Sequence, residues 1–169
     1  IANTFICAAG FKVGKSLFEE SMIDVAKAIL DEGKIFLPKK VVTSNSFEGS
    51  NVQEKSIADI EDNEMILDLI LEDETHTIIN SAKTILWNGP MGVFENELFE
   101  EGTKTLSQAI SSSSAFSIAG GGETLSAINK YINKDDVSYC STGGGAFLEF
   151  MEGKTLPSIK ALNAKNTEE

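Results

Sequence analysis

Short apolar runs rich in β-branched residues alternate along the chain with longer segments in which apolar residues recur at helical spacing. The clearest helical stripe lies in residues 16–32, where Met22, Ala26 and Ile29 share one face before Gly33. Further helices are predicted over residues 75–82, 98–111 and 123–131. Strands are predicted over residues 35–38, 41–43, 65–67, 84–87, 115–119 and 137–140.

A strand followed by three glycines and then a helix occurs twice, with glycines 120–122 and glycines 143–145. This spacing suits right-handed βαβ crossovers, so the pattern predicts an α/β fold with a mostly parallel sheet and helices on both faces. Ligands of such sheets bind at the carboxyl ends of the strands, which is where both triplets are predicted to lie.

Glycines let the backbone approach a ligand closely, and each triplet lies between a predicted strand and a helix. The first turn of a helix presents unpaired N–H groups and the positive end of the helix dipole, which favour an anion such as phosphate. A tight turn, or close packing of helix against strand, would explain a single triplet equally well. Two triplets at equivalent positions favour one shared anion-binding crevice.

Two further features lie near the glycines. Glu123 and Thr124 follow the first triplet, and Glu123 can either hold Mg²⁺ beside a phosphate or simply stabilise the start of the helix. The segment Trp87-Asn88-Gly89-Pro90-Met91-Gly92-Val93-Phe94-Glu95 follows another predicted strand. Its residue types alone indicate a structured loop, in which Asn88 can donate and accept hydrogen bonds and Glu95 can accept them from ribose hydroxyls.

Residues 9–16, Ala-Gly-Phe-Lys-Val-Gly-Lys-Ser, match a relaxed phosphate-binding-loop pattern with Ala9 in place of the first glycine. Ser16 also opens a predicted helix, as such a loop requires. The segment has few glycines to free its N–H groups, and no acidic strand end accompanies it to bind a metal. The pattern match keeps a P-loop-type nucleotide triphosphatase that uses Lys15 as an alternative interpretation, and the missing glycines and acidic strand end count against it.

Composition and charge exclude other classes. The formal net charge is −12 and every one of the 14 basic residues is Lys, so a nucleic-acid partner is not expected. Cys7 and Cys140 are far apart and His76 is single, which predicts no thiol or imidazole metal site. No apolar run reaches the roughly 20 residues that span a bilayer, and no signal region opens the chain, so no membrane partner and a cytoplasmic location are expected.

Three segments, in order, resemble the signature of phosphoglycerate kinase: Trp87 to Glu95 as quoted above, Ala119-Gly120-Gly121-Gly122-Glu123-Thr124, and Ser141-Thr142-Gly143-Gly144-Gly145-Ala146. Flanking segments agree, among them Gly14-Lys15-Ser16-Leu17 and Leu148-Glu149-Phe150-Met151-Glu152-Gly153. The resemblance covers essentially the whole chain. It implies a Rossmann-like three-layer domain, with residues 1–169 forming the C-terminal, nucleotide-binding domain of that family, incomplete at its N-terminal side.

The resemblance implies a glycolytic kinase that transfers a phosphoryl group between 1,3-bisphosphoglycerate with ADP and 3-phosphoglycerate with ATP. Mg²⁺ would accompany the nucleotide, and 3-phosphoglycerate would bind an N-terminal domain that this chain lacks. The full-length protein would be a monomer, and the present chain alone would be inactive. The abrupt apolar opening at Ile1, without an initiator Met, agrees with a piece of a longer protein.

Matched position by position, the resemblance also implies the parts of the site. The apolar adenine slot would be formed by Leu17, Phe47 and Leu67. Asn88, Gly89 and Pro90 would lie beside the nucleotide, and Glu95 would hold the ribose. Phosphate oxygens would be held by Gly121, Gly122 and Thr124, with Gly120 also binding the nucleotide and Glu123 on the metal. Gly143 and Gly144 would stabilise the transferring phosphoryl group with helix N-terminal N–H groups, which is the catalytic contribution.

Two features of the sequence depart from the family pattern. Glu123 stands where the family usually has Asp, which lengthens the metal-binding side chain by one methylene. Leu69, Ile70 and Leu71 replace the Gly-Pro turn that usually follows the Leu67-Asp68 pair. Two alternatives to the kinase interpretation remain: the P-loop-type triphosphatase described above, and a nucleotide-binding module without catalysis.

Overall fold

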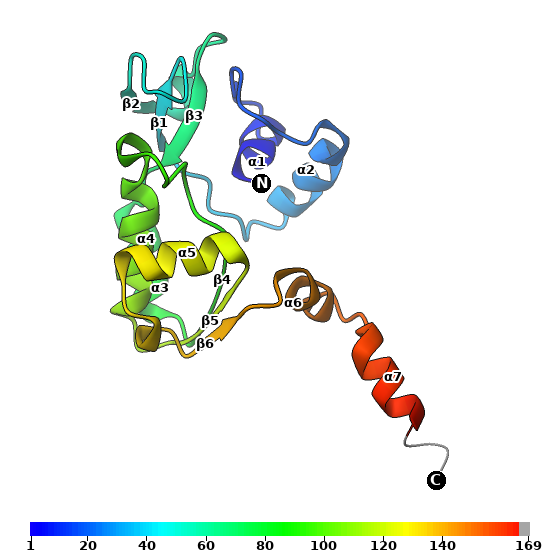
Figure 1. The fold of residues 1–169 in the computed structure, drawn as a ribbon. Coiled ribbons are helices and arrows are strands. Elements are labelled where there is room, and N and C mark those ends of the chain that lie inside the picture. The colour runs from blue at the N-terminus through cyan, green and yellow to red at the C-terminus, as the bar shows by residue number, and fades with distance from the viewer. Residues whose placement is uncertain (166–169) are drawn as a thin grey trace.

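The chain forms two three-stranded sheets that are connected through helices (Figure 1). The computed structural model describes residues 1–165, with side chains as far as residue 163. The first sheet is antiparallel in the order β2-β1-β3, and the second is parallel in the order β4-β5-β6. The strands are β1 (Lys40–Ser44), β2 (Gln53–Ser56), β3 (Met65–Leu69), β4 (Thr84–Asn88), β5 (Phe116–Gly120) and β6 (Tyr139–Ser141).

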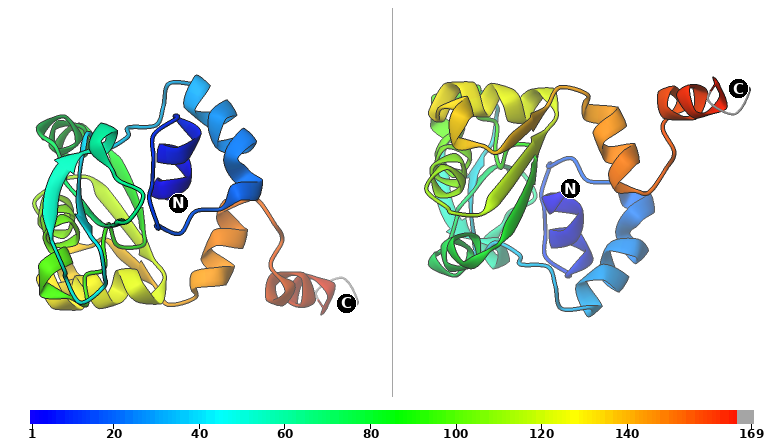
Figure 2. Two further views of the ribbon diagram at one scale, coloured as in Figure 1. Left: turned by 90° about the horizontal axis from the view of Figure 1, so that it is seen from above. Right: turned by 90° about the horizontal axis from the view of Figure 1, so that it is seen from below.

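The α-helices of the described part are α1 (Ala2–Ala8), α2 (Ile23–Asp31), α3 (Asp73–Ser81), α4 (Glu101–Ser111), α5 (Gly122–Tyr131), α6 (Gly144–Met151) and α7 (Pro157–Lys165). Single 3₁₀ turns occur at Glu20–Met22, Ile57–Asp59, Glu97–Phe99 and Lys134–Asp136. Helices α1 and α2 lie side by side, whereas α6 and α7 extend away from the two sheets (Figure 1, Figure 2). Among the residues described, no helix has the length and apolarity that crossing a bilayer demands.

Each sheet has its own apolar core. In the parallel sheet, buried Trp87 and Ala119 pack with Ile110 of α4 and Ile128 of α5. The antiparallel sheet packs its buried residues against α1, in a cluster formed by Ile6, Val13, Val41, Ile57, Ile60 and Ile66. The molecule therefore has two apolar centres, and the segments between them must set the position of one sheet relative to the other.

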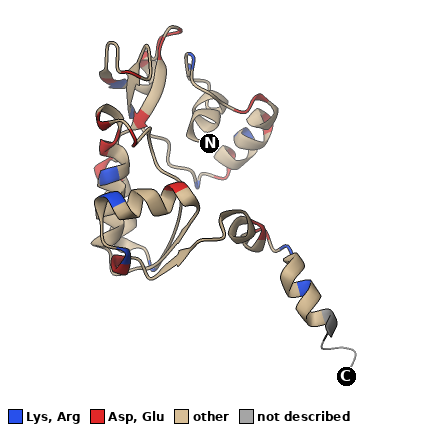
Figure 3. Cartoon of the chain, in the orientation of Figure 1, with Lys and Arg blue, Asp and Glu red and all other residues tan. Residues whose placement is uncertain are grey.

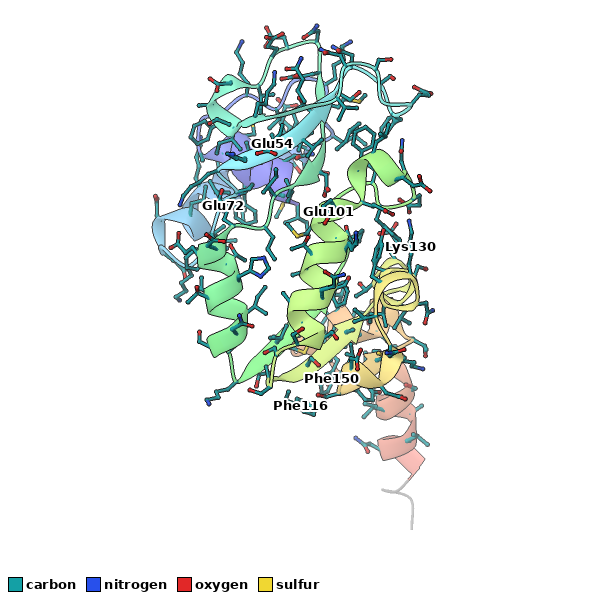
Figure 4. The ribbon with its side chains drawn as sticks, turned by 90° about the vertical axis from the view of Figure 1, so that its left-hand side faces the viewer. Glu54, Glu72, Glu101, Phe116, Lys130 and Phe150 are labelled. Carbon is teal, nitrogen blue, oxygen red and sulfur yellow. The ribbon has the colours of Figure 1, made fainter. Side chains whose placement is uncertain are left out.

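The two faces of the parallel sheet differ in exposure. Alternate residues of a strand point to opposite faces, and the face opposite the buried core carries Leu86, Phe116 and Tyr139, which are 44%, 55% and 58% exposed. Phe116 is labelled in Figure 4, at the end of the molecule that carries the parallel strands. Within the described residues the helices α4 and α5 thus pack against the core face of this sheet.

The predicted α/β fold is confirmed, since β4, β5 and β6 form a parallel sheet flanked by helices. The strands predicted over residues 84–87, 115–119 and 137–140 and the helices predicted over residues 75–82, 98–111 and 123–131 all correspond to observed elements with shifted ends. The antiparallel sheet is an addition: its strands β1 and β3 were predicted, but not their pairing with each other or with β2.

One predicted helix starts later than expected, and one predicted strand was wrong. The helix predicted over residues 16–32 begins only at Ile23, because Ser16 is held against β3 by the Ile66 N–H, which donates to its hydroxyl over 2.8 Å. The strand predicted over residues 35–38 does not form. A strand requires the hydrogen-bonding edge of a neighbour, and residues 35–38 pair with no strand of the described part.

Candidate functional site

Three loops leave the same edge of the parallel sheet. Asn88, the last residue of β4, is in register with Gly120, the last residue of β5, and Gly120 is in register with Ser141 of β6. Because the strands are parallel, the segments that follow them all begin at the carboxyl edge (Figure 1). This edge therefore collects the Trp87–Glu95 loop and both glycine triplets, as the sequence pattern predicted.

The two glycine triplets are in contact. A Cβ atom built on Gly144 would lie 3.2 Å from the Cα of Gly121, so the two turns meet where neither has a side chain. Gly121 has φ of +97°, a conformation that L side chains rarely adopt. Helix α5 begins directly after it at Gly122, and α6 begins at Gly144. The prediction that both triplets lie at one sheet edge is confirmed.

A network of short hydrogen bonds joins the loop after β4 to the loop after β5. The Asn88 side chain donates from Nδ2 to the Gly120 carbonyl over 2.9 Å. The Gly89 N–H donates to the Thr124 hydroxyl over 2.7 Å, and that hydroxyl donates in turn to the Gly120 carbonyl over 2.7 Å. Thr124 is 1% exposed. In this structure its hydroxyl links the two loops rather than facing solvent at a phosphate position.

The two carboxylates predicted to bind ligand groups are both exposed. Glu123 lies in the first turn of α5, directly after the glycines, and Glu95 follows buried Phe94 in the loop after β4. No group of three His, Cys, Asp or Glu side chains in the described part could enclose a metal ion. Such a cage is not needed for Mg²⁺, which commonly uses one or two carboxylates together with phosphate oxygens and water. Glu123 fits that requirement.

The residues predicted to hold adenine lie on the antiparallel sheet and its loops. Leu67 is 4% exposed, and its carbonyl accepts the Val93 N–H over 2.9 Å, which brings β3 against the loop that carries Glu95. Phe47 is 55% exposed, and its carbonyl accepts a hydrogen bond from Asn96 Nδ2 over 2.8 Å. Phe47 and Leu67 are therefore both tied to the segment around Glu95.

Leu17 is less closely associated with this group. Its side chain is 89% exposed, although the neighbouring Ser16 is bonded to Ile66 of β3. Leu67 borders a cavity of about 180 Å³ that lies between the start of α1, β3 and the segment from Met91 to Val93. Neither Leu17 nor Phe47 lines that cavity, so Leu67 alone of the three predicted adenine contacts borders it. Phe47 and Leu67 share a link to the segment around Glu95, and that link runs through their backbone carbonyls.

Asp68 is a buried carboxylate that was not predicted as part of the site. It is 2% exposed and accepts two backbone hydrogen bonds, from the Leu69 N–H over 2.9 Å and from the Gly102 N–H over 2.7 Å. Burial raises the pKa of Asp68 to about 6, although these two hydrogen bonds oppose the shift. A single Asp inside the apolar segment Met65-Ile66-Leu67-Asp68-Leu69 is the sequence signal that could have identified it.

The segment Gly14-Lys15-Ser16 does not form a phosphate-binding loop. Gly14 pairs with Met65, and the Lys15 N–H donates to the Glu64 carbonyl over 2.7 Å. The Ser16 hydroxyl accepts from the Ile66 N–H, and the next α-helix begins only at Ile23. The segment therefore lies along β3, with a backbone N–H already used and no helix N-terminus behind it. The triphosphatase interpretation based on Lys15 is not supported by this geometry.

The chain matches one family of known proteins. The family profile of phosphoglycerate kinase matches residues 1–154. The chain is 52% identical over 180 residues to a phosphoglycerate kinase of Psychrobacter, covering 99% of this chain and 45% of that protein. It is 51% identical over 168 residues to the phosphoglycerate kinase of Vibrio campbellii, covering 98% of this chain and 44% of that protein.

Solved structures give the same result. Phosphoglycerate kinase from Coxiella burnetii superposes with a TM-score of 0.88 at 42% identity, covering 97% of this chain and 44% of that one. The enzyme from Pyrococcus horikoshii superposes with a TM-score of 0.78 at 35% identity, covering 96% and 43%. The chain thus spans less than half the length of these relatives. On the family match and the identities together, the chain belongs to the phosphoglycerate kinase family.

Proposed function

We propose that the chain supplies the MgATP and MgADP site of a phosphoglycerate kinase. The reaction is phosphoryl transfer between 1,3-bisphosphoglycerate with ADP and 3-phosphoglycerate with ATP. The observation that carries the proposal is the contact between Gly121 and Gly144 at the ends of neighbouring parallel strands. That contact puts the N-terminal ends of α5 and α6 beside each other, and both ends present N–H groups suited to an anion.

Phosphate recognition in this proposal relies on backbone groups. The chain has no Arg, and its lysines are spread over several elements rather than gathered in one cluster of the described part (Figure 3). Gly120, Gly121 and Gly122 would hold the nucleotide phosphates, with Gly143 and Gly144 nearest the transferring group. N–H groups that are already oriented stabilise the charge that develops during in-line transfer without having to reorganise.

The nucleoside would lie on the other side of the loop that follows β4. Asn88, Gly89 and Pro90 would border the nucleotide, with Glu95 on the ribose and the base near Phe47 and Leu67. The hydrogen bonds of Phe47 and Leu67 to the segment around Glu95 support this placement. Thr124 would act mainly through its two links to Gly89 and Gly120, which hold the loops on either side of the phosphates.

Glu123 would hold Mg²⁺, which when bound neutralises negative charge on the nucleotide phosphates. The side chain is exposed at the start of α5, beside the glycines that would contact those phosphates. A carboxylate alone at this position would repel phosphate, so the metal and the nucleotide are expected to bind together.

The second substrate is assigned to a part of the protein outside this chain. A phosphate and a carboxylate, as in 3-phosphoglycerate, are usually held by Arg and Lys clusters, and the chain has no Arg. We therefore propose that residues 1–169 correspond to the nucleotide-binding, C-terminal part of the enzyme. The relatives, which are more than twice as long, are compatible with this division.

Replacement of Glu123 by Gln tests the metal assignment. Gln keeps the shape of the side chain but lacks its charge, so E123Q is expected to lose the Mg²⁺-dependent part of its ADP affinity. Loss of one charged ligand corresponds to about 1.5–3 kcal/mol, which is roughly a tenfold to hundredfold weaker Kd. Calorimetric titration with ADP, with and without Mg²⁺, measures the difference.

Glu101 offers a matched control for this experiment. It also lies in the first turn of a helix, α4, and it is exposed (Figure 4). Its carboxylate bonds to Lys104 and Thr105 of its own helix and to neither glycine triplet. E101Q therefore removes the same favourable interaction with a helix dipole, and it should leave the Mg²⁺-dependent ADP affinity unchanged. Equal effects of E123Q and E101Q would show that Glu123 stabilises its helix and does not bind the metal.

A further inference from the structure

The backbone of the loop after β4 is held from two helices. Thr124 of α5 accepts the Gly89 N–H, as described above. On the other side, Thr103 of α4 accepts from the Met91 N–H over 3.1 Å and from the Gly92 N–H over 3.3 Å. Thr103 is 0% exposed. Without its hydroxyl, two backbone N–H groups of the loop would lose their acceptor inside the protein.

The start of α4 is in turn fixed to the antiparallel sheet. Asp68 of β3 accepts the Gly102 N–H through Oδ2 over 2.7 Å. Gly92 and Gly102 both press against this carboxylate, because a Cβ atom on either glycine would collide with Asp68 Oδ1. A Cβ on Gly92 would also lie only 2.6 Å from the Phe99 carbonyl. Both glycines are thus required by close approach at this point.

These contacts form a single joint between the two sheets. Asp68 belongs to the antiparallel sheet next to Leu67, and the loop from Gly89 to Gly92 continues the parallel strand β4. The Val93 N–H adds a direct bond of 2.9 Å to the Leu67 carbonyl. The two apolar cores are separate, so the distance between the sheets at this place depends on the joint.

We propose that Thr103 and Asp68 are positioning residues for the nucleotide, which set the base-binding side of the site at the correct distance from its phosphate-binding side. The inference rests on the proposed nucleotide site. Neither residue needs to touch the ligand. Their role is to hold Leu67 on one sheet and the Asn88–Pro90 segment on the other in one geometry, so that a ligand with both a base and phosphates meets both sides at once.

Ser107 provides an internal control on the same helix. It is 0% exposed like Thr103, and its hydroxyl donates to the Thr103 carbonyl over 2.7 Å. That bond lies within α4 and does not reach the loop. S107A therefore removes a buried hydroxyl from the same helix while leaving the joint intact, whereas T103V removes a hydroxyl of the joint and keeps the side-chain shape.

The test compares two ligands in the 169-residue chain. T103V is expected to weaken MgADP binding by about tenfold, as loss of the loop's acceptor implies, and to leave the affinity for magnesium pyrophosphate within twofold. Pyrophosphate needs only the phosphate-binding side, so it does not sense the distance between the sheets. T103S restores the hydroxyl and should restore MgADP affinity, and S107A should keep it. Amide hydrogen exchange at Met91 and Gly92 should accelerate in T103V alone.

The outcomes separate this inference from the proposed function. Equal MgADP affinity in T103V and the unsubstituted chain overturns the inference, and so does an equal loss in S107A. If the unsubstituted chain binds no MgADP, the proposed site fails and the inference fails with it. Should T103V not fold, Asp68→Asn replaces it, because Asn lacks one of the two acceptor oxygens; an unchanged ratio of MgADP to pyrophosphate affinity in that variant also overturns the inference.

Discussion

The 169-residue chain is expected to show no measurable transfer of phosphate from ATP to 3-phosphoglycerate. Alignment of two substrates for in-line transfer contributes about 7–11 kcal/mol to lowering the barrier, and each 1.36 kcal/mol is tenfold in rate. The chain has no Arg and no cluster of basic residues in its described part to align the second substrate. The rate should therefore lie about 10⁵-fold or more below that of a full-length relative.

A coupled assay that detects ADP release measures this difference, with the full-length Psychrobacter enzyme assayed in parallel. The matched control is a chimera in which this chain replaces the 45% of that enzyme to which it aligns. The chimera should be active, because its nucleotide-binding part then faces a complete partner region. An inactive but folded chimera would favour a nucleotide-binding module without catalysis. If the isolated chain turned over at nearly the rate of the full-length enzyme, 3-phosphoglycerate could not bind in a part of the protein outside this chain, as we propose.

Replacement of Lys55 by Ala is expected to lower the free energy of unfolding by about 3–5 kcal/mol, since it leaves a buried carboxylate without its counter-charge. Glu64 is 3% exposed and accepts from Lys55 Nζ over 3.0 Å, from the Thr43 hydroxyl over 2.9 Å and from the Glu61 N–H over 2.7 Å. Burial alone would raise the pKa of Glu64. The hydrogen bonds from Glu61, Lys55 and Thr43 outweigh burial and hold the pKa below its ordinary value.

Urea unfolding of K55A beside K40A tests this expectation. Lys40 lies on the same sheet and forms an ion pair of 2.8 Å with Glu54, but the two side chains are 58% and 53% exposed. An exposed pair contributes at most about 1 kcal/mol, so K40A should be nearly neutral. If K55A and K40A lowered the free energy of unfolding by similar amounts, burial would not be what makes the Lys55–Glu64 pair stabilising.

The parallel half of the fold could be predicted because its signals are local. Strands β4 and β5 carry apolar runs, and a glycine triplet begins at the end of β5 and another begins two residues after β6. Strands β5 and β6 and helix α5 follow one another within about thirty residues, so short-range pattern and the rule for parallel crossovers suffice. The contact between Gly121 and Gly144 follows from that connectivity.

The antiparallel half could not be predicted in the same way, because distant contacts decide it. Strand β2 (Gln53–Ser56) is polar throughout, with its first two residues exposed and its last two partly buried, so it carries no apolar alternation. Residues 16–19 have apolar positions that suit a helix, yet the bond between Ser16 and Ile66, 50 residues apart, holds them along β3. Residues 35–38 are apolar enough for a strand, but strand formation depends on a neighbour that local sequence does not reveal.

The site shows the same division. Glycine spacing was enough to predict that both triplets lie at one sheet edge, whereas the hydrogen bonds of Asp68, Thr103 and Thr124 depend on which backbone groups their side chains reach. Thr124 suits a phosphate contact by its position after the glycines, but its hydroxyl bonds to Gly89 and Gly120 across 35 and 4 residues of sequence. No spacing rule identifies such partners in advance.

The central claim is that nucleotide binds at the carboxyl edge of the parallel sheet, and amide chemical shifts on titration with MgADP test it most directly. The largest shifts are expected at Gly89, Gly121, Gly122, Gly143 and Gly144, with smaller ones at Glu95 and Leu67. The amides of Gly14, Lys15 and Ser16 should stay unchanged. Saturable shifts centred on Gly14–Lys15–Ser16, with none at the two glycine triplets, would contradict the claim and return the nucleotide to the segment along β3.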